Sequence, residues 1–194
     1  MKILILKPSS LGDVVQALPV LRLLKLHLPD SEIFWWVDSN LAPLLENDPD
    51  LAGVIRFERR GWAAPQNWLN LCRQIQWARA QSFDWVIDLQ CLARSGAFAW
   101  LANGKFLIGL DEPREGARGF YDVVVSRRSF QTHAVDWYLD VLRVLNVPAH
   151  SYMQSMAISV AIHCHRYQSQ ITTGTDHTHR DFTSISNQDF LKRP

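Results

Sequence analysis

The sequence predicts an α/β protein with a Rossmann-like, doubly wound parallel sheet. Short apolar segments alternate with helical segments from residue 1 to residue 147. Trp35 and Trp36 are adjacent in one predicted strand, so they point to opposite faces, and both faces must be covered, as in a parallel sheet. With 194 residues, of which 47% are hydrophobic and 20% charged, the chain can bury the core of one ordinary domain.

The elements follow in order from the spacing of the apolar residues. Residues 2–7 form a first strand. Apolar residues then repeat at helical spacing from Val14 to Leu28, until Pro29 ends the helix. Further strands are predicted at residues 32–37, 53–57, 84–89, 105–110 and 122–125. Further helices are predicted at residues 41–46, 68–78, 93–102 and 134–145.

The character of the chain changes near Pro148. All eight tryptophans precede this point, whereas five of the seven histidines follow it. We therefore divide the chain into a Rossmann-like domain, residues 1–148, and an irregular tail, residues 149–194, in which only residues 156–162 are predicted to form a strand. The tail histidines match no common structural zinc spacing, so we predict no metal site.

Composition excludes several classes of protein. A formal net charge of +1 argues against a general nucleic-acid-binding surface. Three widely spaced cysteines give no disulfide framework and favour a reducing compartment. The apolar run at residues 3–6 is too short for a signal peptide, and no stretch is long enough to cross a bilayer. These features together predict a cytoplasmic protein.

The first thirteen residues carry the clearest functional signal. An apolar strand leads into a Ser-Ser-Leu-Gly turn, and Asp13 stands where the next helix begins. Loops that leave the carboxyl ends of parallel strands bind ligands, and a helix amino terminus favours a negative charge. Asp13 is therefore a candidate general base, the alternative being that it only caps the helix. Gly12 is the one glycine of this turn, so the G-x-G-x-x-G fingerprint of dinucleotide-binding enzymes is missing.

Further polar residues fall at loops where an anionic ligand could bind. Arg59 and Arg60 follow the third strand, and Arg114 and Arg118 precede the sixth; guanidinium groups bind carboxylates and phosphates in a bidentate manner. A solvated basic surface is the alternative. Asp88 lies deeper on its strand and is interpreted as structural. The remaining candidates are Lys7, Ser9, Ser10, Gly12, Gln90 and His133. The two serines and the glycine could offer donors to a ligand or only form the turn, and His133 could donate to a ligand or pack on the sheet. Gln90, at the end of the fourth strand, is placed to contact ligand hydroxyls, and Lys7 could pair with Asp13 or with a ligand.

Four segments resemble, in order and spacing, the lipopolysaccharide heptosyltransferases of glycosyltransferase family 9. The first is Lys-Pro-Ser-Ser-Leu-Gly-Asp-Val-Val-Gln-Ala-Leu-Pro at residues 7–19. The others are Val-Ile-Asp-Leu-Gln at residues 86–90 with Ala-Arg-Ser at 93–95, the loop of residues 114–121, and His-Ala-Val-Asp at residues 133–136. The resemblance extends over residues 1–147.

The resemblance implies a two-domain GT-B enzyme that transfers heptose from ADP-heptose to the anionic, lipid-linked inner core of lipopolysaccharide with inversion. The amino-terminal half would bind the acceptor, and Asp13 matches the general base. ADP-heptose would be the donor substrate, with no metal and no further cofactor. The location implied is cytoplasmic, with peripheral contact at the inner membrane.

The tail departs from this pattern, because it resembles none of the family's donor-site sequence. The donor-binding residues therefore remain unknown, and we expect an acceptor-binding half that is weakly active or inactive, binds a nucleotide sugar only when a donor domain is supplied, and can self-associate through uncovered apolar surface. Two other classes stay open. One is a non-catalytic module that binds an anionic glycan or lipid core. The other is an ordinary Rossmann regulatory or oxidoreductase domain, against which the missing glycines argue.

Overall fold

The computed structural model describes residues 1–58, 65–112, 115–129 and 131–149, all within the compact unit Met1–Met156. The strands form one six-stranded, all-parallel sheet with the order β3-β2-β1-β4-β5-β6. This is the order of a doubly wound Rossmann sheet, so the predicted fold class is confirmed. The strands are β1 (Lys2–Leu6), β2 (Glu32–Asp38), β3 (Gly53–Phe57), β4 (Trp85–Asp88), β5 (Phe106–Leu110) and β6 (Val123–Val125).

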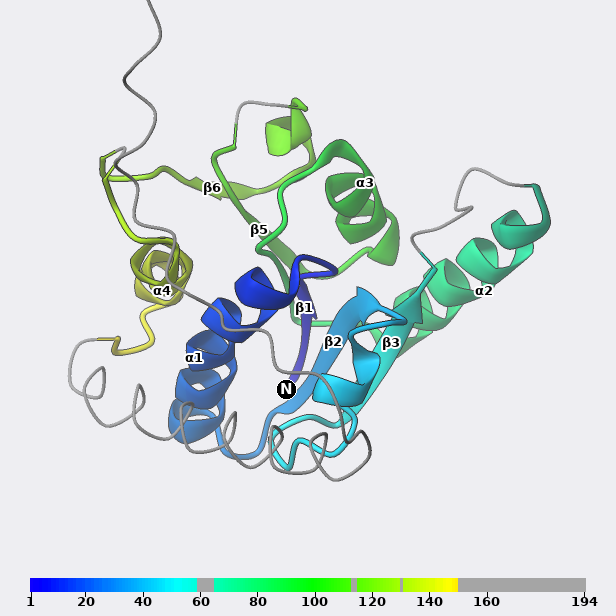
Figure 1. Cartoon of the computed structure of the whole chain (residues 1–194), viewed down its shortest axis with the longest axis horizontal. Helices are drawn as coiled ribbons and strands as arrows, with labels where there is room; N and C mark the ends of the chain where they lie inside the picture. The colour runs from blue at the N-terminus through cyan, green and yellow to red at the C-terminus, as the bar shows by residue number, and fades with distance from the viewer. Residues whose placement is uncertain (59–64, 113–114, 130, 150–194) are drawn as a thin grey trace, which may run out of the picture. The chain divides into compact units, whose positions relative to one another are not determined.

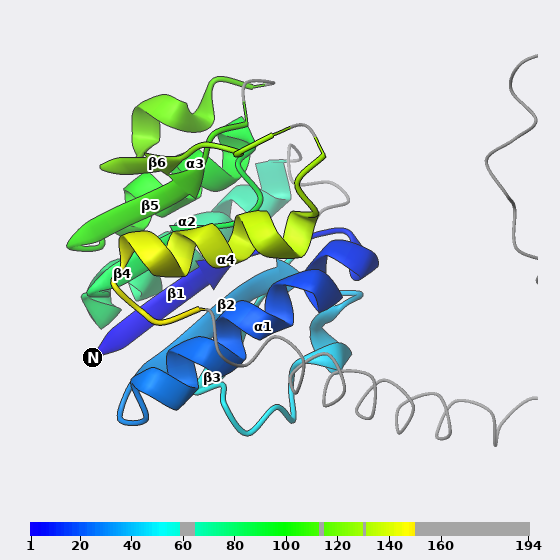
Figure 2. The ribbon, with the colours of Figure 1, turned by 90° about the vertical axis from the view of Figure 1, so that its left-hand side faces the viewer.

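Helices cover both faces of the sheet (Figure 1). One face carries α1 (Leu11–His27) and α4 (Ala134–Val144), which lie side by side in Figure 2. The other face carries α2 (Pro65–Gln81) and α3 (Ala93–Ala102). Two short 3-10 helices, η1 (Ala42–Leu44) and η2 (Ala117–Phe120), lie in the connections. No helix in the described ranges combines the length and the apolar character needed to cross a bilayer.

Two hydrophobic cores form, one on each side of the sheet. Trp35 belongs to the core under α1 and α4, whereas Trp36 belongs to the core under α2 and α3. Both tryptophans are fully buried, which confirms that adjacent residues of β2 face opposite cores. Trp36 stacks on Phe98 of α3 at 4.6 Å between ring centroids and meets Phe57 at 4.4 Å.

The observed boundaries of the elements differ from the predicted ones mainly at helix ends, where capping hydrogen bonds decide them. The helix predicted from Val14 begins at Leu11, because Ser10 and Asp13 form the amino-terminal cap. Gly12 therefore lies in the first turn of α1, not in the preceding loop. The helix predicted at residues 41–46 is the single 3-10 turn η1, and η2 was not predicted. Such short turns bury too few residues to leave a periodic pattern.

The sheet brings the first and fourth strands together at the point where the strand order reverses. There the loop after β1 meets the segment after β4: the backbone N–H of Ser9 donates to Gln90 Oε1 at 3.3 Å, and that of Leu89 donates to the Leu6 carbonyl at 3.0 Å. Ligands of open α/β sheets bind in such a crevice. The predicted strand at residues 156–162 and the tail histidines lie outside the described residues.

Candidate functional site

Asp13 both caps α1 and keeps one carboxylate oxygen open. Its Oδ2 accepts hydrogen bonds from the backbone N–H and the hydroxyl of Ser10, each at 3.0 Å. No donor of the described residues bonds to Oδ1. A Cβ placed on Gly12 would meet no atom within 4 Å apart from its chain neighbours and the backbone of its own helix, so the space at Gly12 is open. The capping role is therefore real, and the geometry also leaves an oxygen free to accept a proton.

Lys7 supplies a buried positive charge to this turn. It is 4% exposed, and its Nζ donates to the Leu89 carbonyl at 3.0 Å and lies 5.1 Å from the centre of the Tyr138 ring. Burial lowers the pKa of Lys7, and attraction to Asp13 partly opposes that change. Lys7 thus acts on the site through its field, while its burial leaves little of it for contact with a ligand.

Tyr138, which lies in the field of Asp13, and Arg127, which acts on Tyr138, were not among the candidates from the sequence. Burial raises the pKa of Tyr138 on α4, the Asp13 carboxylate raises it further, and the charge of Arg127 lowers it. Arg127 lies over the Trp137 ring at 5.2 Å and donates to the Thr132 carbonyl. The available signals were the basic pair that follows β6 and an aromatic residue on the buried stripe of α4.

A buried network below the turn fixes the end of β4. Asp88 is fully buried; its Oδ1 accepts from the backbone N–H groups of Gln90 at 2.8 Å and Cys91 at 3.0 Å, and its Oδ2 accepts from the Tyr121 hydroxyl at 2.7 Å. Burial raises the pKa of Asp88, and these hydrogen bonds oppose the rise. The network holds Gln90 where its amide oxygen accepts from Ser9, which agrees with a structural role for Asp88.

The structure therefore gathers Ser9, Ser10, Gly12, Asp13 and Gln90 at one turn, with Lys7 buried beneath. It does not link Arg118 or His133 to that turn by any hydrogen bond or ion pair that it describes. Arg118 is exposed, with its guanidinium 3.7 Å from Asp111, and His133 caps α4 by accepting from the Val135 N–H at 3.3 Å. Arg59, Arg60 and Arg114 lie outside the described residues.

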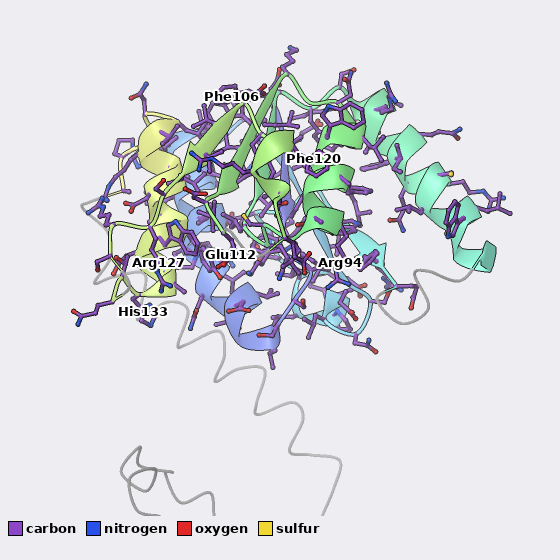
Figure 3. The ribbon with its side chains drawn as sticks, turned by 90° about the horizontal axis from the view of Figure 1, so that it is seen from above. Arg94, Phe106, Glu112, Phe120, Arg127 and His133 are labelled. Atoms are coloured by element: carbon purple, nitrogen blue, oxygen red, sulfur yellow. The ribbon has the colours of Figure 1, made fainter. Side chains whose placement is uncertain are left out.

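Figure 3 places Arg94, Glu112, Arg127 and His133 along one edge of the sheet and Phe106, where β5 begins, at the opposite end. This edge is formed by the carboxyl ends of the strands, the same edge at which α1 begins. Within the described ranges, no three His, Cys, Asp or Glu side chains gather closely enough to hold a metal ion. The chemistry that this edge offers is proton transfer to one carboxylate, with polar and cationic side chains nearby.

Comparison with known proteins identifies a family for this chain. The sequence model of glycosyltransferase family 9 (heptosyltransferase) matches residues 70–180, more than half of the chain. That match continues beyond Val147, where the resemblance seen in the sequence was expected to stop.

Individual relatives carry the same description. The chain is 27% identical to the lipopolysaccharide core heptosyltransferase OpsX of Haemophilus influenzae, over 80% of this chain and 43% of that protein. It is 33% identical to lipopolysaccharide heptosyltransferase 1 of Pseudomonas aeruginosa, over 71% of this chain and 38% of that protein. The chain thus spans less than half the length of these relatives.

Solved structures agree in fold. The E. coli heptosyltransferase WaaC with ADP is similar with a TM-score of 0.69 and 28% identity, over 77% of this chain and 49% of that chain. A family 9 glycosyl transferase from Veillonella parvula is similar with a TM-score of 0.66 and 26% identity, over 77% of this chain and 42% of that chain. The match of the family model over more than half of the sequence shows that this chain belongs to glycosyltransferase family 9, the heptosyltransferases.

Proposed function

We propose that this chain forms the acceptor-binding half of an inverting glycosyltransferase of lipopolysaccharide inner-core synthesis, with Asp13 as its general base. The observation that carries the proposal is the Asp13 carboxylate at the carboxyl edge of the sheet, where Ser10 occupies Oδ2 and Oδ1 is open. Relatives described as lipopolysaccharide heptosyltransferases support the choice of substrate class.

In the proposed reaction a hydroxyl of the acceptor sugar donates its hydrogen bond to Asp13 Oδ1. The hydroxyl oxygen forms a bond to the anomeric carbon of heptose, the bond from that carbon to the diphosphate breaks on the opposite face, and ADP leaves with the electron pair. The hydroxyl proton passes to the Asp13 carboxylate. Lys7 lies buried beneath the turn, where burial lowers its pKa and the nearby Asp13 partly opposes that change.

The other polar groups would hold the acceptor. Gln90, Ser9 and Ser10 offer amide and hydroxyl groups to the sugar, and Arg118 suits its carboxylates or phosphates. The same role is proposed for Arg59, Arg60 and Arg114 from the sequence, and for His133 at the start of α4. The donor ADP-heptose, used without a metal, would bind residues that remain to be identified, and the reaction would take place in the cytoplasm beside the inner membrane.

Acceptor binding tests this proposal without turnover. The 194-residue chain is titrated with deacylated inner-core oligosaccharide by calorimetry. Arg118→Ala should weaken binding by about 1–3 kcal/mol, since it removes a charge-assisted contact. The control Arg79→Ala removes the same charge from α2, away from the site. Equal weakening by both variants would mean that net charge alone attracts the ligand, and absence of binding by the parent would refute the acceptor-binding role.

Gly12→Ala tests where the acceptor lies. The added methyl group meets no atom within 4 Å apart from its chain neighbours and the backbone of its own helix, and alanine favours a helix more than glycine does, so the melting temperature should not fall. If the acceptor approaches Asp13 through this space, the variant should bind it more weakly. Unchanged affinity would place the acceptor elsewhere on the edge.

A second function, a non-catalytic module that binds an anionic glycan, also has an observation in its favour. Asp13 already serves as the cap of α1, a role that needs no chemistry. The module would bind the oligosaccharide as well as the enzyme does, but it would not depend on Asp13 for any rate. Turnover of Asp13 variants therefore separates the two functions.

A further inference from the structure

The connection between β5 and β6 is fastened to α3. We call residues 115–121 of this connection the η2 segment. Glu115 Oε2 accepts a hydrogen bond from the backbone N–H of Ala93, where α3 begins, at 2.9 Å. A Cβ on Gly96 of α3 would lie 2.8 Å from the Phe120 ring, so the segment packs directly against this glycine. The η2 segment therefore has a fixed place on α3.

Tyr121, the last residue of the segment, is held between β5 and the end of β4. A Cβ on Gly109 of β5 would collide with the Tyr121 ring, so the ring can lie here only because this residue has no side chain. The Tyr121 hydroxyl donates to Oδ2 of the fully buried Asp88 at 2.7 Å. Because a hydrogen bond to a buried group is stronger than one in water, this contact ties the segment to β4.

Asp88 connects the η2 segment to the Asp13 turn. Its Oδ2 accepts from Tyr121, while its Oδ1 accepts from the Gln90 N–H at 2.8 Å. The side-chain oxygen of Gln90 accepts in turn from the Ser9 N–H at 3.3 Å. Three hydrogen bonds in series therefore join the Tyr121 hydroxyl to the turn that carries the proposed base.

The η2 segment also carries a cation at the carboxyl edge of the sheet. The Arg118 side chain is 70% exposed, and its guanidinium lies 3.7 Å from Asp111. Asp111 directly follows β5, and its N–H donates to the carbonyl of Val125, the last residue of β6. Glu112, the next residue, lies at the carboxyl edge in Figure 3. The hydrogen bonds through Asp88 thus link the two segments that place Arg118 and Asp13 at this edge.

We propose that Tyr121 is a positioning residue for the acceptor. By tying the η2 segment to Asp88, it sets the separation between the Arg118 guanidinium and the Asp13 carboxylate. An acceptor that uses both groups must present an anionic group and a reacting hydroxyl at that separation, and a misplacement of about 1 Å is enough to slow such a reaction strongly. The inference rests on the proposed function, because it takes Arg118 and Asp13 as two contacts of one acceptor.

A double-mutant cycle measures the positioning. The 194-residue chain and its variants are titrated with deacylated inner-core oligosaccharide by calorimetry. Tyr121→Phe removes the hydroxyl and keeps the ring, and we expect it to weaken binding about tenfold. In the Arg118→Ala background the same change should weaken binding by less than about twofold, because the group that Tyr121 positions is gone.

The matched control is Ser31→Ala. It removes a buried hydroxyl that donates to the Leu28 carbonyl at 2.6 Å, directly before β2 and therefore at the opposite edge of the sheet. It should lower the melting temperature and leave the affinity unchanged. Gly96→Ala is a second test variant, because its methyl group presses on the Phe120 ring and keeps every hydrogen-bonding group. It should weaken binding in the parent but not in Arg118→Ala, and circular dichroism identifies the variants that fold.

Amide hydrogen exchange tests the connection without any ligand. The Ser9 N–H should exchange at least about threefold faster in Tyr121→Phe than in Ser31→Ala, because only the former lies in the series of bonds that ends at Ser9. Equal exchange in the two variants would overturn the inference.

The binding outcomes separate this inference from the proposed function. Equal weakening by Tyr121→Phe in both backgrounds, or weakening of the same size by Ser31→Ala, would overturn the positioning role and leave the acceptor-binding role in place. If the parent binds no oligosaccharide, the proposed function fails and the positioning role falls with it.

Discussion

Asp13→Asn separates chemistry from architecture in the proposed enzyme. Asparagine has nearly the same shape as aspartate, and its amide oxygen can accept both hydrogen bonds that Ser10 donates at 3.0 Å. The cap of α1 is therefore retained. The substitution removes the negative charge and the ability to take up a proton.

The two losses differ in size. Removing a negative charge from the first turn of a helix costs about 0.3–1 kcal/mol of stability. Removing a general base raises the activation free energy by about 3–5 kcal/mol, which corresponds to a hundredfold or larger loss of rate. We therefore expect turnover to fall on the order of a hundredfold or more, while the melting temperature and the acceptor affinity stay nearly unchanged.

The assay requires a complete pair of domains. Residues 1–149 are joined to the carboxyl-terminal half of a full-length family member, and ADP release is followed at saturating acceptor. The control Ser10→Ala removes one of the two hydrogen bonds to Asp13 but keeps the carboxylate, so it should lose less than about tenfold in rate. If Asp13→Asn keeps most of the parent's turnover, Asp13 is not the base and the binding-module function gains support.

Three further predictions concern the stability of the domain and the activity of the chain. Tyr121→Phe removes the donor to buried Asp88 and should lower the free energy of unfolding by about 1–3 kcal/mol in urea. Because burial raises the pKa of Asp88 in the folded state, the contribution of Asp88 to stability falls as the pH rises above about 4. The loss of stability in the variant should therefore be larger at about pH 7 than at about pH 4, and an equal loss at both would contradict this. Trp36→Ala should lower the free energy of unfolding by about 3–5 kcal/mol in the same urea titration, because the ring is buried. Trp100 is exposed, so Trp100→Ala should change that free energy by less than about 0.5 kcal/mol. The 194-residue chain by itself should transfer no detectable heptose from ADP-heptose, since positioning the donor and stabilising the departing diphosphate supply much of the rate; measured transfer would locate a donor site within it.

The long, periodic elements of the fold were accessible from the sequence. The ranges 53–57 and 93–102 match β3 and α3 as observed, because apolar periodicity over a whole element reports which side is buried. The adjacent tryptophans of β2 predicted two covered faces for the same reason. The start of α1 was predicted three residues late, because a cap is decided by hydrogen bonds at the end of the helix rather than by its buried stripe.

Part of the site was also readable. The strand, turn and helix order predicted Asp13 at a carboxyl edge, where the structure has it, and the family resemblance is the source of its proposed role as general base. Sequence spacing could not show that Lys7 is buried under that turn, because Lys7 contacts Tyr138, which is distant along the chain. Nor could it show that Tyr138 lies in the field of Asp13, because β1, β4 and α4 must pack before the two residues meet.

By itself, the sequence determined the alternation of strands and helices, the all-parallel sheet and the likeness to family 9, because local periodicity and contiguous motifs are properties of neighbouring residues. Only the tertiary structure decided which charges share the site. It joined Ser9 to Gln90, buried Asp88 beneath them, and left one oxygen of Asp13 open. It also left Trp68 of α2 and Trp100 of α3 exposed. Burial and through-space electrostatics depend on the packing of distant segments, which no local pattern records.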